Sequence, residues 1–161
     1  MAQVILLCGR ICSGKSTYAQ LLRQRHPASV VLSCDELMLT LFPQGAGEYH
    51  DMLAERARQY HFALSLDIVA SGADVILDWG FWTRDWREEA RVFYREHGVP
   101  CALHYVDVPA DVWKRHIEDR NRAVLSGKTT AYFVDEGLLA KLESRFQEPR
   151  DDEVDLRYRP D

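Results

Sequence analysis

The stretch that decides the fold is residues 4–17, which read Val4-Ile5-Leu6-Leu7-Cys8-Gly9-Arg10-Ile11-Cys12-Ser13-Gly14-Lys15-Ser16-Thr17. A short apolar run leads into the pattern G-x-x-x-x-G-K-S-T, the signature of a phosphate-binding loop between a strand and a helix. Two glycines let the backbone curl, so that successive N–H groups point inward around a polyphosphate. The helix that follows adds the positive end of its dipole. The stretch therefore predicts that residues 9–17 bind a nucleoside triphosphate.

The polar residues that close this loop have separate expected roles. Lys15 can reach the β- and γ-phosphates, and the Ser16 hydroxyl can ligate magnesium. The alternative interpretation is a glycine turn that carries a chance lysine. Two glycines at the required spacing, followed by Lys, Ser and the helical run 18–22, argue against chance.

The composition is that of an ordinary globular protein. The chain has 161 residues, of which 47% are hydrophobic and 28% charged, which suits a single domain spanning residues 1–161. No apolar stretch approaches the roughly 20 residues that a membrane helix needs. Because the first residues already read as a strand, we expect no secretory signal, no membrane partner and a cytoplasmic location.

The charged residues, cysteines and histidines of the chain indicate which ligands it is expected to bind. A formal net charge of −5 gives no basic footprint for long nucleic acids and leaves room for a neutral or cationic small substrate. The cysteines at 8, 12, 34 and 101 include no C-x-x-C pair, so we expect buried, reduced thiols. The histidines form no H-E-x-x-H or similar spacing, and no zinc site is expected.

Strand-like and helix-like segments alternate along the chain. This alternation predicts an α/β fold whose parallel sheet is covered by helices on both faces. The expected strands are 3–8, 29–33, 74–78, 101–108 and a short fifth strand within 154–158, and the expected helices are 15–25, 48–70, 84–97, 110–123 and 134–146. The acidic segment from Glu148 to Glu153 reads as a surface connection.

Two acidic residues follow the second and third apolar runs. Since ligands of open α/β sheets bind at the carboxyl ends of the strands, Asp35 and Asp78 are expected beside the triphosphate. Asp35 could accept the proton of an attacking hydroxyl, and Asp78 has the form of an acid that supports magnesium. The alternatives are a helix N-cap for Asp35 and a turn residue for Asp78. Both acids in a chain with a phosphate loop favour the functional interpretation.

An aromatic cluster follows Asp78 and consists of Trp79, Phe81, Trp82 and Trp86. One interpretation places Trp79, Phe81 and Trp82 in the wall of an acceptor pocket, where they stack on a ring or sugar. The other is core packing of the next helix, and we expect packing to claim at least two of the four rings. Arg84 could face the acceptor or a phosphate, or extend into solvent.

The helix at 110–123 is rich in arginine. Its simplest interpretation is a solvated face with i,i+4 ion pairs. The sharper one is a lid, around 115–131, whose arginines stabilise charge on the transferring phosphoryl group. Arg115 and Arg122 share a face of this helix, whereas Arg120 lies off that stripe, so the three need not do one job.

With these motifs, the chain resembles small AAA-type ATP-binding kinases of the P-loop superfamily. This group is related to polynucleotide 5′-hydroxyl kinases, chloramphenicol phosphotransferase and zeta-toxin-type sugar-nucleotide kinases. The resemblance runs nearly end to end. It rests on the loop at 9–17, Ser-x-Asp at 33–35, Leu-Asp-x-Gly-Phe-Trp-x-Arg at 77–84, Val-Asp-Val-Pro at 106–109, Arg-x-x-x-x-Arg-Asn at 115–121 and Arg-Phe-Gln-Glu-Pro at 145–149.

The resemblance implies a three-layer P-loop NTPase fold, with a five-stranded parallel sheet in the order 2-3-1-4-5 and a helical lid. It also implies ATP and Mg²⁺ as cofactors, Asp35 as the base, and Arg115 and Arg120 as catalytic lid arginines, with Arg120 contacting ATP as well. Polynucleotide kinases tend to place a phosphate-gripping arginine three residues after the base, where this chain has Met38.

Three functions are weighed on these grounds. The leading one is an ATP-dependent phosphotransferase that acts on a hydroxyl of a small metabolite, sugar or antibiotic. The second is a 5′-hydroxyl kinase for RNA or DNA ends, which the acidic charge and Met38 disfavour. The third is a non-catalytic nucleotide-binding regulator, for which the sequence offers neither a water-positioning residue nor a partner surface.

Overall fold

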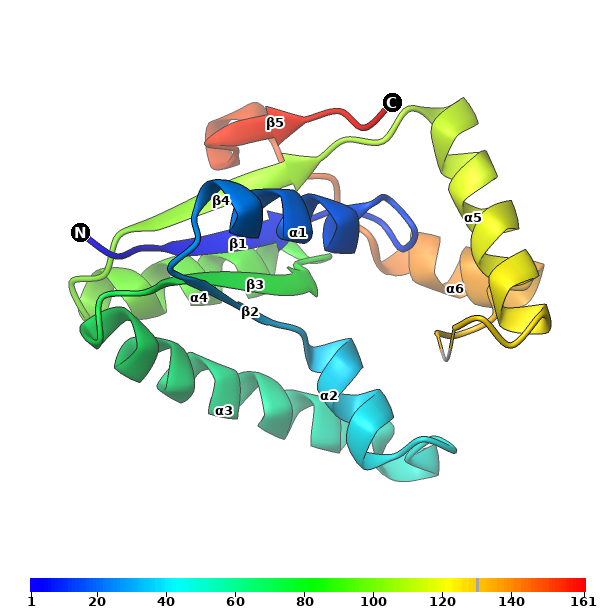
Figure 1. The fold of residues 1–161 in the computed structure, drawn as a ribbon, viewed down its shortest axis with the longest axis horizontal. Helices are drawn as coiled ribbons and strands as arrows, with labels where there is room; N and C mark the ends of the chain where they lie inside the picture. The colour runs from blue at the N-terminus through cyan, green and yellow to red at the C-terminus, as the bar shows by residue number, and fades with distance from the viewer. Residues whose placement is uncertain (130) are drawn as a thin grey trace.

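A five-stranded parallel sheet forms the centre of the computed structural model, which describes residues 1–129 and 131–161 (Figure 1). Its strands are β1 (Val4–Cys8), β2 (Ser29–Leu32), β3 (Asp74–Gly80), β4 (Cys101–Val106) and β5 (Leu156–Tyr158). They lie in the order β2-β3-β1-β4-β5, and each neighbouring pair is parallel. The predicted fold class and strand order are therefore confirmed.

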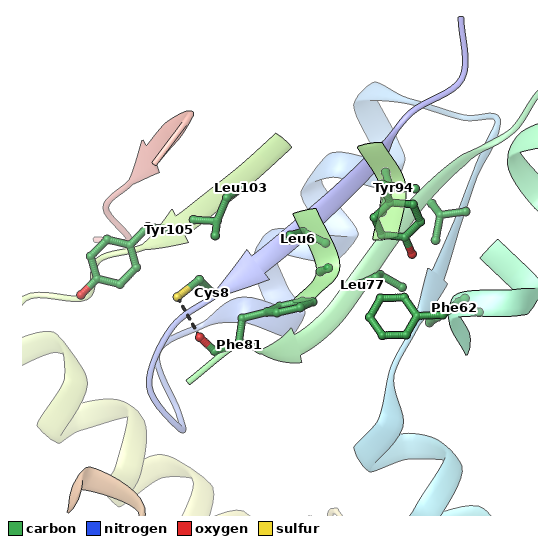
Figure 2. Packing of buried hydrophobic residues seen from close by; sticks show 12 residues of the cluster. Leu6, Cys8, Phe62, Leu77, Phe81, Tyr94, Leu103 and Tyr105 are labelled. Carbon is green, nitrogen blue, oxygen red and sulfur yellow. Dashed lines mark hydrogen bonds between the residues drawn. The ribbon is translucent and has the colours of Figure 1, made fainter. Parts of the chain in front are cut away.

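Strand β1 is apolar throughout because both of its faces are covered. All five of its residues are buried, and alternate side chains enter two separate cores. Val4 and Leu6 pack with residues of the helices at 50–70 and 84–96. Figure 2 shows Leu6 in the same cluster as Phe62 and Tyr94 of these helices. Ile5 and Leu7 pack on the opposite face against the helix at 15–25. This alternation follows from the two-residue period of a strand and gives the three layers.

The helices are α1 (Lys15–Arg25), α2 (Cys34–Leu41), α3 (His50–Ala70), α4 (Arg84–Glu96), α5 (Ala110–Leu125) and α6 (Glu136–Arg145), with 3₁₀ turns η1 (Gly47–Tyr49) and η2 (Asp151–Glu153). Helices α5 and α6 lie beyond the carboxyl ends of the strands, on the side where β1 leads into the loop (Figure 1). Among the described residues, no helix is both long and apolar enough to cross a bilayer. Thr130, within the expected lid at 115–131, lies outside the described residues.

Two expectations about segment ends need correction. Strand β3 continues to Gly80, so Asp78 lies inside the strand rather than after it. The segment from Glu148 to Glu153 is more than a surface connection, because Pro149 is buried and the Glu153 carboxylate pairs with the buried Arg87. The ion pair joins this segment to the helix at 84–96.

Candidate functional site

The loop between β1 and α1 has a backbone that depends on its two glycines. Gly14 has a φ of +99°, in the left-handed region that glycine adopts without steric cost. A Cβ atom on Gly9 would lie 2.7 Å from Ser13 Oγ and 3.1 Å from Val106 O, too close for any side chain. Cys12 also has a positive φ, of 58°. A curled loop of this kind directs N–H groups inward.

The four loop carbonyls of residues 9–12 each accept a hydrogen bond. Lys15 Nζ donates to the carbonyls of Gly9 at 3.2 Å and Arg10 at 2.7 Å. Two side chains of α5 reach the next two carbonyls: Trp113 Nε1 donates to Ile11 O at 2.7 Å, and His116 Nδ1 lies 3.0 Å from Cys12 O. These contacts satisfy the carbonyls of residues 9–12, and a curled loop of this kind offers its N–H groups to an anion.

The start of α1 adds to this anion-binding character. Its first intrahelical bond runs from Tyr18 N to Gly14 O, so the N–H groups of the first turn have no partner within the helix. Gly14 supplies no side-chain cap, and the first turn contains no acidic residue. A cavity of about 220 Å³ lies here, lined by Cys12, Ser13, Gly14, Lys15, Ser16, Thr17, His116, Asp119 and Arg120. This cavity suits a phosphate chain.

Ser16 and Asp78 form a pair of oxygen donors at the edge of the cavity. Ser16 Oγ donates to Asp78 Oδ2 at 2.8 Å, which joins α1 to β3. Hydroxyl and carboxylate oxygens are the ligands that Mg²⁺ prefers, and Mg²⁺ keeps several waters and phosphate oxygens as further ligands. No cluster of three or more His, Cys, Asp or Glu suited to a metal occurs in the described part of the chain. The pair therefore fits a magnesium ion held jointly with a phosphate chain.

Asp35 lies on α2 and is electrostatically coupled to the loop. The surrounding protein withdraws water from this carboxylate although its side chain still reaches solvent, and this raises its pKa. Asp78 raises the pKa further, whereas Lys15, Arg120 and His50 lower it. The pKa of Lys15 is lowered by burial, and Asp78 and Asp35 act against that change. The structure thus brings two carboxylates, a lysine and an arginine together at the carboxyl ends of β2 and β3.

The N-cap of α2 is Ser33 rather than Asp35. Ser33 has extended backbone angles, and its Oγ accepts a hydrogen bond from Glu36 N at 3.2 Å. Asp35 lies in the first turn of the helix, so the cap interpretation does not account for it. Met38, at the position where polynucleotide kinases tend to carry arginine, lies on the buried face of the same helix.

The expected aromatic wall is mostly core. Phe81 is only 1% exposed and packs in the core beside Trp79, so its placement in an acceptor wall is wrong. Trp79 is partly buried against the same core and also stacks on His61. Trp82 stacks on Trp86, whose ring lies 3.8 Å from the guanidinium carbon of Arg58. Packing therefore claims at least two of the four rings, as expected.

The arginines of α5 divide as the helical spacing indicated. Arg120 lines the cavity over the loop, and its charge reaches Lys15, Cys12 and Asp35. Arg115 is exposed and is not among the residues that line the cavity, so this structure does not bring it to the site. Arg122 is exposed and pairs with Asp119 at 3.2 Å. Its interpretation as a solvated surface residue fits the structure.

Arg10 and Arg84 contact the protein rather than the cavity. The Arg10 guanidinium lies over the rings of Trp113 and Phe146, at 5.1 and 5.4 Å, and ties the loop to α5 and α6. Arg84 is exposed, and its backbone N–H donates to Gln147 Oε1 at 2.8 Å. Neither side chain lines the cavity over the loop.

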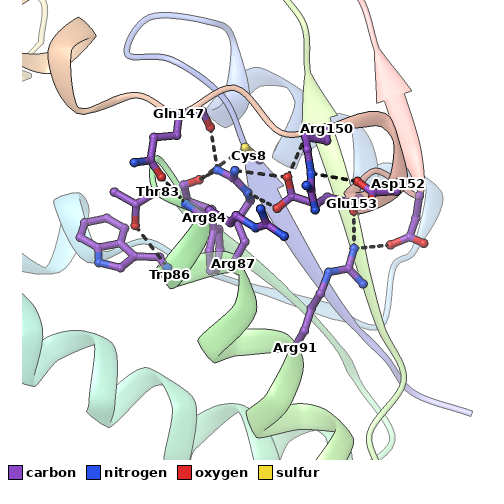
Figure 3. Close-up of polar contacts among 12 residues, drawn as sticks. Cys8, Thr83, Arg84, Trp86, Arg87, Arg91, Gln147, Arg150, Asp152 and Glu153 are labelled. Carbon is purple, nitrogen blue, oxygen red and sulfur yellow. Dashed lines mark hydrogen bonds and ion pairs between the residues drawn. The ribbon is translucent and has the colours of Figure 1, made fainter.

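Sequence reasoning missed a buried arginine that fixes the end of β3. Figure 3 shows Arg87 among residues of the 147–153 segment. Its Nη1 donates to Phe81 O and to Gln147 O, each at 2.9 Å, and its Nε donates to Glu153 Oε1 at 2.9 Å. Gln147 N in turn donates to Trp82 O at 2.7 Å. No spacing signal could reveal this contact, since Arg87 and Glu153 are 66 positions apart.

Asn121 is a second residue whose role was missed, although it belongs to the motif at 115–121. Its side chain pairs with the Val134 backbone in both directions, donating to Val134 O and accepting from Val134 N, each at 2.7 Å. The pair joins α5 to the segment before α6, across the expected tip of the lid.

The geometry at the end of β1 defines a class of protein: a nucleotide-binding α/β protein with a phosphate loop, an acidic residue within β3 and another in the helix that follows β2. The AAA domain family matches residues 4–149, and the chain belongs to that family. No curated protein matches the chain.

Several solved structures share the fold. Kti12 of Chaetomium thermophilum, in complex with ADP-AlF3, has a TM-score of 0.72 and 16% identity, with 98% of this chain and 88% of that chain covered. The APS kinase CysC of Mycobacterium tuberculosis, in complex with AMPPNP and APS, has a TM-score of 0.61 and 22% identity, with coverages of 99% and 89%. A chain of the Pnkp1/Rnl/Hen1 RNA repair complex has a TM-score of 0.67 and 18% identity, with coverages of 89% and 43%. At these identities the likeness establishes the fold alone.

Proposed function

We propose that the protein is an ATP-dependent kinase that transfers the γ-phosphate to a hydroxyl group of a small molecule. The observation that carries the proposal is the position of Asp35 beside the phosphate loop, where its charge interacts with those of Lys15 and Asp78. A loop alone indicates nucleotide binding, whereas a second carboxylate beside it provides a proton acceptor for a nucleophile.

Each residue has one part in the proposed reaction. The loop N–H groups and Lys15 bind the phosphate chain, and Arg120 faces the same cavity from α5. Ser16 and Asp78 would hold magnesium, which neutralises charge that develops between the β- and γ-phosphates. Asp35 accepts the proton of the acceptor hydroxyl as its oxygen bonds to the γ-phosphorus and the bond to ADP breaks.

Two neighbours support nucleotide use, as the APS kinase structure contains AMPPNP and the Kti12 structure contains ADP-AlF3. The APS kinase also contains a small acceptor, APS. The four cysteines are free thiols, which agrees with the cytoplasmic location that we propose.

A polynucleotide acceptor is the second candidate, because a chain of an RNA repair complex shares the fold. Two observations weigh against it. The net charge of −5 offers no cationic track for a phosphate backbone. Met38 stands at the position where an arginine would bind a substrate phosphate, and with 4% exposure its side chain cannot contact a bound nucleic-acid strand.

The test is a labelling experiment with γ-³²P-ATP and two acceptor panels, one of sugars, polyols and hydroxylated antibiotics and one of 5′-hydroxyl oligonucleotides. Asp35→Asn removes the base, and Glu36→Gln serves as its matched control because Glu36 is the exposed neighbour on the same helix. We expect label on a small compound with the parent chain and with Glu36→Gln, and a loss of about 10²–10⁴-fold with Asp35→Asn. Efficient labelling of oligonucleotide 5′ ends at moderate salt, with no small compound competing, would contradict the proposed acceptor class. ATP hydrolysis that no acceptor stimulates would favour a regulator instead.

A further inference from the structure

A histidine of α5 lies at the nucleotide cavity without an assigned role. His116 is half-buried and is one of the residues that line the cavity over the loop. Its Cε1 atom lies 3.6 Å from the position that a Cβ on Gly14 would occupy, so the ring covers the start of α1. Its Nδ1 lies 3.0 Å from Cys12 O. Among the described residues, the lining of this cavity includes no other histidine.

The hydrogen bond to Cys12 determines which ring nitrogen carries a proton. A carbonyl oxygen can only accept, so Nδ1 must be the donor in this contact. In the neutral ring, Nε2 is then an unprotonated acceptor. Nε2 has no hydrogen-bond partner among the described residues. A phosphate oxygen also only accepts at neutral pH, so Nε2 can bind phosphate only when the ring is the doubly protonated cation.

We propose that His116 contacts the phosphate chain of the bound nucleotide and takes up a proton when the nucleotide binds. The inference rests on the proposed nucleotide site. The charged groups that line the cavity with His116 are the cations Lys15 and Arg120 and the anion Asp119, which lies on the same helix. The Cys12 thiol stays neutral because burial raises its pKa, and the C-terminal segment contributes the uncharged Pro160. A bound diphosphate adds at least two negative charges and shifts the balance toward the cation.

The competing explanation is structural, because the bond to Cys12 O also docks α5 on the loop. Asparagine separates the two roles: its amide N–H can replace Nδ1 as the donor to Cys12 O, but it offers nothing at the position of Nε2. His97→Asn is a matched control. His97 Nδ1 lies 2.7 Å from the backbone oxygen of Phe93, in the same kind of contact, at the end of α4 away from the loop.

The experiment is isothermal titration of ADP with magnesium chloride at pH 7.5, in two buffers of different ionisation enthalpy. The difference between the binding enthalpies in the two buffers gives the number of protons taken up. Protons that ADP itself gains or releases contribute equally for every variant and cancel when variants are compared. We expect the parent and His97→Asn to take up more protons on binding ADP than His116→Asn does. We also expect His116→Asn to raise the Kd about tenfold, the loss of one charge-assisted hydrogen bond.

Equal proton uptake and equal Kd in the parent and His116→Asn would overturn the inference while leaving the proposed function intact. A parent chain that binds no ADP would overturn both. If circular dichroism shows that His116→Asn does not fold, the inference is tested on the parent chain by nuclear magnetic resonance. The ¹³Cε1 resonance of His116 must then titrate at a higher pH with ADP than without, and an unchanged titration would contradict the inference.

Discussion

Replacing Arg87 by methionine is expected to destabilise the protein by about 3–5 kcal/mol, the usual result of breaking a buried ion pair from one side. Methionine keeps much of the volume of the arginine side chain, so the loss comes from polar contacts rather than from a cavity. Arg87 is 1% exposed, and its side chain donates to Glu153, Phe81 O and Gln147 O. The substitution removes the Arg87 donor from two carbonyls and from a carboxylate that is itself 13% exposed.

Urea unfolding followed by tryptophan fluorescence measures this change, and a constant m-value shows that the unfolded state is unaffected. Arg122→Met is the control, since Arg122 forms an ion pair with Asp119 on the surface, with side chains 76% and 67% exposed. We expect the control to lose no more than about 1 kcal/mol. The double variant Arg87→Met/Glu153→Gln removes the unpaired charge and should be milder than Arg87→Met alone.

The pH dependence of the stability is an independent test of the Arg87–Glu153 ion pair. Burial alone would raise the pKa of Glu153, but hydrogen bonds from Arg87 and from Arg150 N, together with the Arg87 charge, lower it. A carboxylate with a lowered pKa stabilises the fold above its ordinary pKa and loses that contribution as the pH falls. The parent should therefore lose stability below about pH 4.5, and Arg87→Met should lose less of it in that window. A destabilisation under 1 kcal/mol, or a double variant no milder than the single, would refute this account of Arg87.

Two further substitutions test the loop and the cap of α2. Lys15→Ala should leave the unfolding midpoint close to that of the parent and reduce phosphoryl transfer at least about a hundredfold, since Lys15 lines the cavity and we propose that it binds phosphate. Normal ATP binding and turnover would show that the loop is only a turn. Ser33→Ala should cost about 1 kcal/mol in urea unfolding, because its Oγ accepts from Glu36 N, and a change below a few tenths would contradict the cap assignment.

The features that the sequence predicted well are those encoded locally. The run from Val4 to Cys8 is apolar because both faces of β1 are buried, and the loop after it has a fixed spacing of glycine, lysine and serine. Helix α1 begins at Lys15 and ends at Arg25, the bounds that its pattern predicted. Alternating strands and helices were enough to indicate a parallel sheet.

The cap of α2 shows where local patterns become ambiguous. Ser33 and Asp35 are two positions apart, and both residue types cap helices. The extended backbone of Ser33, with φ −116° and ψ 119°, decides between them, and sequence alone does not encode that choice. The same applies to Asp78, which precedes two further residues of β3 rather than ending the strand.

Burial that comes from distant segments could not be predicted. Arg87 has charged neighbours and reads as part of a solvated helix face, yet the 147–153 segment covers it. Phe81 reads as a loop aromatic, yet it is 1% exposed and belongs to the core, and it has a φ of +47° directly after β3. The roles of Asp35, Lys15 and Arg120 stay predictions that experiment must test.

The measurement that tests the central claim most directly compares Asp35→Asn with the parent in ADP affinity, phosphoryl transfer and thermal stability. Desolvation raises the pKa of Asp35, so the charged form of this carboxyl group is unfavourable in the folded protein. The stability that its protonated form contributes is lost as the pH rises. Asparagine, which is always neutral, should therefore not lower the melting temperature at pH 7. We predict unchanged ADP affinity, transfer reduced by about 10²–10⁴-fold, and parent activity that falls as the pH drops through the raised pKa. Unchanged transfer together with a lower melting temperature would contradict the account and make Asp35 a structural residue.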